Sequence, residues 1–243
     1  MMENGTYFVE NKVFHAVLPQ VMGTRLDWVT VGVREKPARS VWNRYRDWVE
    51  EASHRLNRFD PASELSGVNA GIIPVGEELE NLIRIADRYR DRTGGLFDIR
   101  WDRKGLDFGG LAKGWALSRA KDQLERVGCT SAFINFGGSS ILALGSHPHG
   151  PAWQVALPNP FGDDTLEVWD LKDTCMSTSG NVPGYTGHII DPLTGERRCE
   201  RRVTVALCPD PMDAEVLSTV LMVAPEKAWE TVFPAAIMKC YNV

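Results

Sequence analysis

Helical and strand-like segments follow one another in an irregular order along this chain, and this order restricts the fold class more than any other feature. From Pro37 onward, apolar side chains recur every three or four residues, which predicts a helix with one buried face; they are Val41, Tyr45, Trp48, Val49, Ala52 and Leu56. The same spacing predicts a second helix that includes residues 79–89 and ends at Gly94. Further helices are expected over residues 110–127 and 212–223, the last with Asp213 as its cap.

Short apolar runs separated by glycine or proline predict the strands. They cover residues 12–18, 24–33, 131–136, 141–144, 153–157, 166–171, 203–207 and 235–239. The first two form a hairpin, residues 57–76 are polar and turn-rich, and a short helix is expected near residues 226–231. Because helices and strands do not alternate as βαβ units, the expected class is α+β, with mixed antiparallel sheets and packed helices. We expect one domain over residues 1–243, with two intertwined subdomains as the alternative.

Composition excludes several classes of protein. The 27 Lys and Arg residues are outnumbered by 32 Asp and Glu residues, and the resulting net charge of −5 argues against bulk nucleic-acid binding. The five cysteines form no CxxC pair, so reduced and mostly buried thiols are expected rather than a zinc site or disulfides. The N-terminus has no signal-peptide pattern, and no apolar run approaches the ~18 residues of a membrane span. The expected location is cytoplasmic.

A glycine pair at Gly109 and Gly110 leads directly into the third predicted helix, with Lys113 in its first turn. Free amide groups at a helix start form an anion site, and a cation placed there is easier to explain beside a phosphate. On spacing alone, the alternative is that Asp107 caps the helix and Lys113 is solvated. The segment matches neither a Walker A loop nor a dinucleotide-binding GxGxxG motif.

Two further places carry residue types with chemistry. Glu215 and Thr219 are four apart in a predicted helix and therefore share a face, where oxygen ligands suit Mg²⁺, although such a pair is usually a solvated face. His188 precedes an apolar pair and is an acid/base candidate near neutral pH, although a histidine at a strand start is more often structural. Hydroxyl residues at 177–179 lead into Gly180, and glycines at 137–138 allow close approach of a ligand to the backbone.

Taken in order, these segments resemble the ApbE family of FAD:protein FMN transferases. The resemblance covers roughly residues 21–223, and its most specific parts are the AKG and HIIDPxTG segments. Its motifs are Met22-Gly23-Thr24, Phe59-Asp60-Pro61-Ala62-Ser63-Glu64-Leu65-Ser66 with Asn69, Gly95-Leu96-Phe97-Asp98, the run from Leu106 to Gly114, Asn135-Phe136-Gly137-Gly138, Thr178-Ser179-Gly180, His188-Ile189-Ile190-Asp191-Pro192-Leu193-Thr194-Gly195, and the helix from Ala214 to Thr219.

The resemblance implies a T-fold-like architecture that binds FAD in a cleft beside Mg²⁺. It also implies cleavage of the FAD pyrophosphate, release of AMP, and transfer of FMN to a Ser or Thr of a target flavoprotein. By position, the residues that would bind the cofactor are Met22, Phe59, Leu96, Phe97, Asp98, Asp107, Lys113, His188 and Ile189. Lys113 and His188 would be catalytic, the lysine on the phosphates and the histidine as acid or base. Gly110, through its carbonyl, Glu215 and Thr219 would hold the metal.

The chain departs from the family pattern at several positions. Glu215 stands where the family usually has Asp, Ser139 where Asp or Asn is common, and Ser118 where Asp is frequent. The segments at residues 99–106 and 179–188 are shorter than usual, which puts part of the cleft wall in question. Two other functions therefore stay open beside the transferase: a metal-dependent FAD pyrophosphatase and a non-catalytic flavin-binding protein. An unrelated α+β domain is the remaining alternative.

Overall fold

A long antiparallel sheet organises the computed structural model, which describes residues 5–243. Its eight strands lie in the order β1-β2-β3-β4-β5-β8-β11-β12, and each pairs antiparallel with its neighbours. The strands of this sheet are β1 (Gly5–Phe8), β2 (Val13–Val21), β3 (Thr24–Val31), β4 (Ser131–Phe136), β5 (Ser140–Leu144), β8 (Thr174–Gly180), β11 (Arg202–Cys208) and β12 (Ile237–Asn242). The expected α+β class is confirmed.

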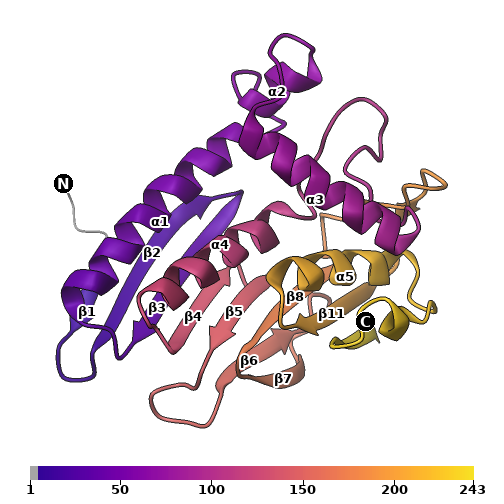
Figure 1. Cartoon of the computed structure of the whole chain (residues 1–243). Helices are drawn as coiled ribbons and strands as arrows, with labels where there is room; N and C mark the ends of the chain where they lie inside the picture. Colours follow the sequence, from indigo (N-terminus) through magenta and orange to yellow (C-terminus); the bar gives the residue numbers. More distant parts are fainter. Residues whose placement is uncertain (1–4) are drawn as a thin grey trace.

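Helices cover one face of this sheet, as Figure 1 shows. Helix α1 packs on β2, α4 on β5, and α5 on β8 and β11, while α4 contacts both α1 and α5. The helices are α1 (Glu35–Arg55), α2 (Glu64–Asn69), α3 (Glu77–Thr93), α4 (Ala112–Arg126), α5 (Pro211–Val223) and the 3₁₀ turn η1 (Trp229–Thr231). The predicted stripe in α1 is its packing face, because Val41, Tyr45, Val49 and Ala52 are all buried.

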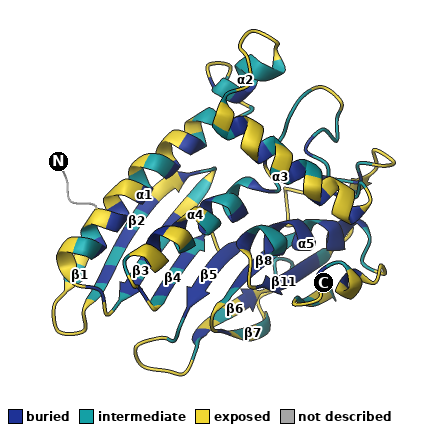
Figure 2. Ribbon diagram, in the orientation of Figure 1, coloured by how far each residue is buried: buried dark blue, intermediate teal, exposed yellow. Residues whose placement is uncertain are grey.

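The opposite face is covered over β5, β8 and β11 by a hairpin of β6 (Trp153–Pro158) and β7 (Thr165–Leu171). Trp153, Leu157 and Leu171 of this hairpin pack against apolar residues of the large sheet. Burial on both faces explains why every residue of β5 is buried, as Figure 2 shows along this strand. A third, two-stranded sheet joins β9 (Ile189–Ile190) and β10 (Arg197–Arg198).

Several element predictions need correction. The cap of α5 is Asp210, not Asp213, because Asp210 accepts the amides of Met212 and Asp213, and Pro211 at the first helical position fixes the start there. Asp213 instead pairs with Arg92. The last strand runs over Ile237–Asn242 rather than residues 235–239, and the expected helix near residues 226–231 is only a 3₁₀ turn. Strands β1, β8 and β10 and helix α2 were not predicted, while β9 is the apolar pair that follows His188.

All five cysteines are free in the structure, and three of them, Cys129, Cys175 and Cys208, are buried as expected. Burial raises the pKa of the Cys175 and Cys208 thiols to about 12, so they are protonated and unreactive. Within residues 5–243, no helix is both long enough and apolar enough to cross a bilayer. No export signal is expected at the N-terminus, and its first four residues lie outside the described residues. The cytoplasmic location stays a prediction.

Candidate functional site

Helices α4 and α5 pack tightly against each other at Gly114, and this contact lies at the centre of the candidate site. A Cβ atom added to Gly114 would lie 2.8 Å from the Pro211 carbonyl oxygen and 3.0 Å from the Glu215 Cβ. Only glycine fits such a distance without displacing backbone. The contact brings Lys113, the preceding residue, within reach of Glu215.

Lys113 and Glu215 form an ion pair. The Lys113 Nζ lies 3.1 Å from Glu215 Oε1 and donates to Ser140 Oγ at 2.7 Å and to Ser139 Oγ at 2.8 Å. An ammonium group has three protons, so these three oxygens use its full donor capacity. Glu215 is only 4% exposed, and a carboxylate this deeply buried requires such a partner.

Hydroxyl groups surround the second oxygen of Glu215. Glu215 Oε2 accepts from Ser140 Oγ at 2.7 Å and from Ser177 Oγ at 2.9 Å. Ser140 of β5 and Ser177 of β8 are register partners, which places them side by side under α5. Ser218 Oγ lies 2.9 Å from both Ser177 Oγ and Ser179 Oγ, so a chain of hydroxyls joins the half-buried Ser179 to the buried carboxylate. We call Ser140, Ser177, Ser179 and Ser218 the serine cluster.

The start of α4 offers unpaired amide groups beside this ion pair. Among the described residues, the N–H groups of Gly110, Lys113 and Gly114 have no hydrogen-bond acceptor. Leu111 precedes α4 and supplies no side-chain cap, so the helix N-terminus remains open to an anion. Asp107 does not cap the helix; its Oδ1 accepts from the Gly109 amide at 2.9 Å instead.

The three predicted metal ligands fit Mg²⁺ in donor type but are not equally available. A Cβ on Gly110 would lie 3.7 Å from Thr219 Oγ1, so these two residues are neighbours. Thr219 Oγ1 donates to the Glu215 carbonyl and keeps its lone pairs, and the Gly110 carbonyl accepts no hydrogen bond from residues 5–243. The Glu215 carboxylate, however, is held by Lys113. The described part of the chain contains no cluster of three or more His, Cys, Asp or Glu side chains suited to a metal.

Asp107 belongs to a second polar group at the edge of the site. Its Oδ2 accepts from Arg58 Nη1 at 2.6 Å and from the Trp101 indole at 3.1 Å. The Arg58 guanidinium also pairs with Asp102 and lies 5.8 Å from the ring of Phe59. Phe59 is 87% exposed, so its ring is open to a planar ligand, while the oxygens of Asp107 are already hydrogen-bonded within the chain.

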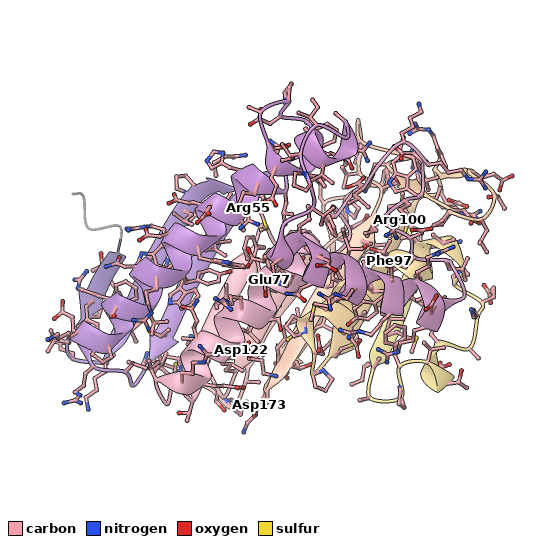
Figure 3. All side chains as sticks on the ribbon, turned by 45° about the horizontal axis from the view of Figure 1, so that its top comes forward. Arg55, Glu77, Phe97, Arg100, Asp122 and Asp173 are labelled. Carbon is pink, nitrogen blue, oxygen red and sulfur yellow. The ribbon has the colours of Figure 1, made fainter. Side chains whose placement is uncertain are left out.

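The turn at residues 95–98 and the turn at residues 191–195 face each other. Leu96 packs against the cluster of Ile189, Met222 and Val223. Gly95, Asp98, Arg100, Trp101, Pro192 and Leu193 are among the residues that line a cleft of about 430 Å³. Phe97 lies in the turn at residues 95–98 and Arg100 follows it; both are labelled in Figure 3. The buried Phe97 ring packs on Gly110. Asp98 pairs with Arg90 and accepts the Arg100 amide.

A second hollow, of about 480 Å³, lies between α1 and α4 and contains none of the predicted site residues. It is lined by Arg44, Asp47, Trp48, Arg119, Asp122, Gln123 and Arg126. We therefore take the chemically equipped region around Lys113, and not this hollow, as the candidate site.

His188 stacks on Tyr185, with ring centroids 4.3 Å apart and planes at 19°. Partial burial lowers the pKa of His188 below its usual 6.5, and a hydrogen bond with the Tyr185 backbone partly offsets this. The imidazole is therefore mainly neutral at pH 7 and able to accept a proton. In residues 5–243, no hydrogen bond joins it to Lys113 or Glu215.

Met22 occupies the tip of the β2–β3 hairpin in a left-handed conformation with φ of 48°. Its amide donates to Ser53 Oγ at 2.8 Å, which ties the hairpin to α1. The neighbouring Thr24 side chain contacts Gly137, where a Cβ would clash with it. The MGT and NFGG segments are thus adjacent in the fold.

Sequence reasoning missed the serine cluster and Arg58. Ser177 and Ser179 were seen as hydroxyls before a glycine turn, but their alternation along a strand is the signal that both face α5. Ser218 follows Glu215 by three residues and so shares its helical face. Arg58 carried no sequence signal, because its two acidic partners lie 44 and 49 residues away.

Comparison with known proteins identifies the family. The model of the ApbE family matches residues 22–104 and 101–237. These segments cover most of the chain, so this chain belongs to the ApbE family, and the family resemblance expected from the sequence is confirmed.

Curated relatives match over about half of this chain. A protein named FAD:protein FMN transferase from Vibrio cholerae is 31% identical over 132 residues, which are 50% of this chain and 39% of that protein. One of the same name from Rhodobacter capsulatus is 35% identical over 133 residues, which are 51% of this chain and 25% of that protein. The matched region therefore spans well under half the length of these relatives.

Solved structures match over nearly the whole fold. The flavin transferase ApbE from Vibrio cholerae superposes with a TM-score of 0.77 at 20% identity, covering 95% of this chain and 97% of that chain. The ApbE protein from Thermotoga maritima superposes with a TM-score of 0.75 at 23% identity, covering 92% and 93%. The arrangement of sheet and helices is thus that of ApbE structures.

Proposed function

We propose that this chain is an FAD:protein FMN transferase that moves FMN from FAD to a Ser or Thr hydroxyl of a target flavoprotein and releases AMP. The observation that carries this proposal is the position of Lys113 in the first turn of α4, where the N–H groups of Gly110, Lys113 and Gly114 have no acceptor among the described residues. Together they provide positive charge and N–H donors for a pyrophosphate in one place. The family membership and the names of the relatives support the same activity.

In the reaction we propose, the acceptor hydroxyl oxygen bonds to the phosphorus of the FMN half, and the bond from this phosphorus to the AMP phosphate breaks. Lys113 neutralises charge that develops on the pyrophosphate oxygens. His188 takes the hydroxyl proton, for which its lowered pKa keeps it unprotonated. The atoms balance as protein hydroxyl plus FAD giving FMN-protein plus AMP.

The remaining predicted residues have binding roles in this proposal. Phe59 offers its exposed ring to the flavin, with Met22, Leu96, Phe97, Asp98 and Ile189 forming the surrounding turns. Asp107 acts on FAD through the geometry that it imposes on Arg58 and Trp101. A bound Mg²⁺ would neutralise pyrophosphate charge, and Gly110, Glu215 and Thr219 are the residues that would hold it.

The organisation of the chain is part of the proposal. One sheet runs from β1 to β12 and one large core joins residues from Phe14 to Phe233, so we propose a single domain. The partner is an acceptor flavoprotein, with no role for nucleic acid or a membrane span.

The test is AMP release from FAD by the purified protein, measured by chromatography with Mg²⁺ or with EDTA, in the presence and absence of an acceptor flavoprotein. We expect Mg²⁺-dependent AMP together with a covalent FMN adduct on the acceptor, detected by intact mass. Lys113→Met should abolish both, whereas Lys121→Met, on the same helix but bound to the Pro209 carbonyl, should not. AMP without any adduct would identify a pyrophosphatase, and FAD binding without AMP under every condition would identify a non-catalytic flavin carrier.

A further inference from the structure

The Glu215 carboxylate is the only charged group among the three predicted metal ligands, and Lys113 already neutralises it. Lys113 Nζ lies 3.1 Å from Oε1, while the serine cluster binds Oε2 through Ser140 and Ser177. The side chain of Lys113 is only 20% exposed and that of Glu215 only 6%, so the ion pair is largely shielded from solvent. Oε1 is therefore the oxygen that changes partner if Lys113 moves.

We propose that Lys113 is the resident counter-ion of Glu215, and that a divalent cation can use this carboxylate only when a phosphate group draws Lys113 away. The inference rests on the proposed function only for the placement of a nucleotide phosphate near α4. The competition between lysine and metal follows from the ion pair itself.

Three observations support this competition. Gly110 and Thr219 offer neutral oxygens, and a divalent cation held by protein oxygens needs a carboxylate in addition. The described residues provide no cluster of acidic side chains to replace Glu215 in that role. The unpaired amides of Lys113 and Gly114 stand at the same helix start, so a phosphate bound there lies within reach of the flexible Lys113 side chain.

The serine cluster makes the exchange feasible without unfolding the site. Ser140 and Ser177 continue to bind Oε2 when Oε1 is released, so the carboxylate stays in place. Ser140 Oγ accepts from Lys113 through a lone pair and donates its proton to Glu215 Oε2. The hydroxyl can therefore continue to donate to Glu215 after the lysine leaves. A site in which Lys113 merely stabilised the fold would gain no metal affinity on losing it.

The experiment measures binding of Mn²⁺ alone to the full chain, by the electron paramagnetic resonance signal of free Mn²⁺, without flavin. We expect Lys113→Met to bind Mn²⁺ at least about tenfold more tightly than the wild type, which corresponds to about 1.4 kcal/mol. Lys121→Met should match the wild type, and the double variant Lys113→Met/Glu215→Gln should lose the gain. Equal affinity in Lys113→Met and the wild type would overturn the proposal.

A second arm uses the unmodified protein and keeps the proposal testable if Lys113→Met does not fold. Added FAD should raise the Mn²⁺ affinity of the wild type at least about tenfold, after correction for Mn²⁺ bound by FAD itself. An unchanged affinity would contradict the role given to the phosphate. Because neither arm measures AMP, failure of the transferase function and failure of this inference give different results.

Discussion

Replacing Gly114 by alanine tests whether the close approach of α4 and α5 holds the site together. The new methyl group would lie 2.8 Å from the Pro211 carbonyl and 3.0 Å from both the Met212 Cα and the Glu215 Cβ. Two of these three atoms are backbone at the start of α5, so no side-chain rotation relieves the contact. The helices must move apart by several tenths of an ångström.

The magnitude follows from two opposing effects. Overpacking a well-packed core costs about 1–3 kcal/mol, and alanine gains up to about 1 kcal/mol over glycine from helix propensity. We therefore expect Gly114→Ala to lower the free energy of unfolding by about 1–2 kcal/mol, and the melting temperature by roughly 2–4 °C for each of these kcal/mol. Urea denaturation followed by circular dichroism measures the first quantity directly.

Gly67→Ala is the matched control, because Gly67 also lies in a helix and its added Cβ would also be close to a neighbour. That neighbour is the side chain of Ile73, at 3.0 Å, which is exposed at the surface and free to rotate. We expect a change within about 0.5 kcal/mol of the wild type. AMP release should fall in Gly114→Ala only, since Lys113 moves relative to Glu215. Equal stability of the two variants would refute the argument that this crossing needs glycine.

Three other substitutions test separate parts of the site. His188 has a lowered pKa in the folded protein, so its contribution to the free energy of unfolding is complete above about pH 6.5 and is lost as the pH falls through the pKa of the folded state. His188→Gln should therefore reduce the pH dependence of the free energy of unfolding below pH 6.5, and an identical dependence in both proteins would contradict this. Asn69→Ala removes both hydrogen bonds to the Leu106 backbone and should cost about 1–3 kcal/mol in urea denaturation; no loss would show that the clamp is redundant. Phe59→Ala should weaken FAD binding, measured by flavin fluorescence, at unchanged stability, because the ring is exposed; unchanged FAD affinity would exclude it from the flavin site.

The sequence was sufficient where local pattern and tertiary packing agree. The buried face of α1 follows from the spacing of its apolar residues. The end of α3 at Gly94 follows from backbone sterics, because this glycine adopts a left-handed φ of 68°. It failed for short elements whose partners are distant. Strand β8 is too rich in hydroxyls to look like a buried strand, and it forms because β5 and β11 pair on both of its sides.

The sequence indicated which residues to consider for the candidate site, but it gave no information on the contacts between them. The spacing of Glu215 and Thr219 indicated one helical face, and both residues do lie near Gly110 or Lys113. That spacing gave no information on the ion pair, because Lys113 lies about a hundred residues earlier in the chain. Its reach to Glu215 depends on the α4–α5 crossing, a tertiary feature for which Gly114 was the only local sign.

The segment at residues 99–106 is short, which put part of the expected cleft wall in question. In the structure, hydrogen bonds hold both of its ends in place. Its two ends meet through the hydrogen bond from the Asp107 amide to the Ile99 carbonyl at 2.8 Å. Asn69 accepts from the Leu106 amide and donates to the Leu106 carbonyl, which fixes the segment to the end of α2. With both ends held, the Trp101 indole donates to Asp107 Oδ2, and Trp101 lines the same cleft as Leu193. We therefore expect that loss of the Asn69 anchor weakens flavin binding in addition to lowering the free energy of unfolding.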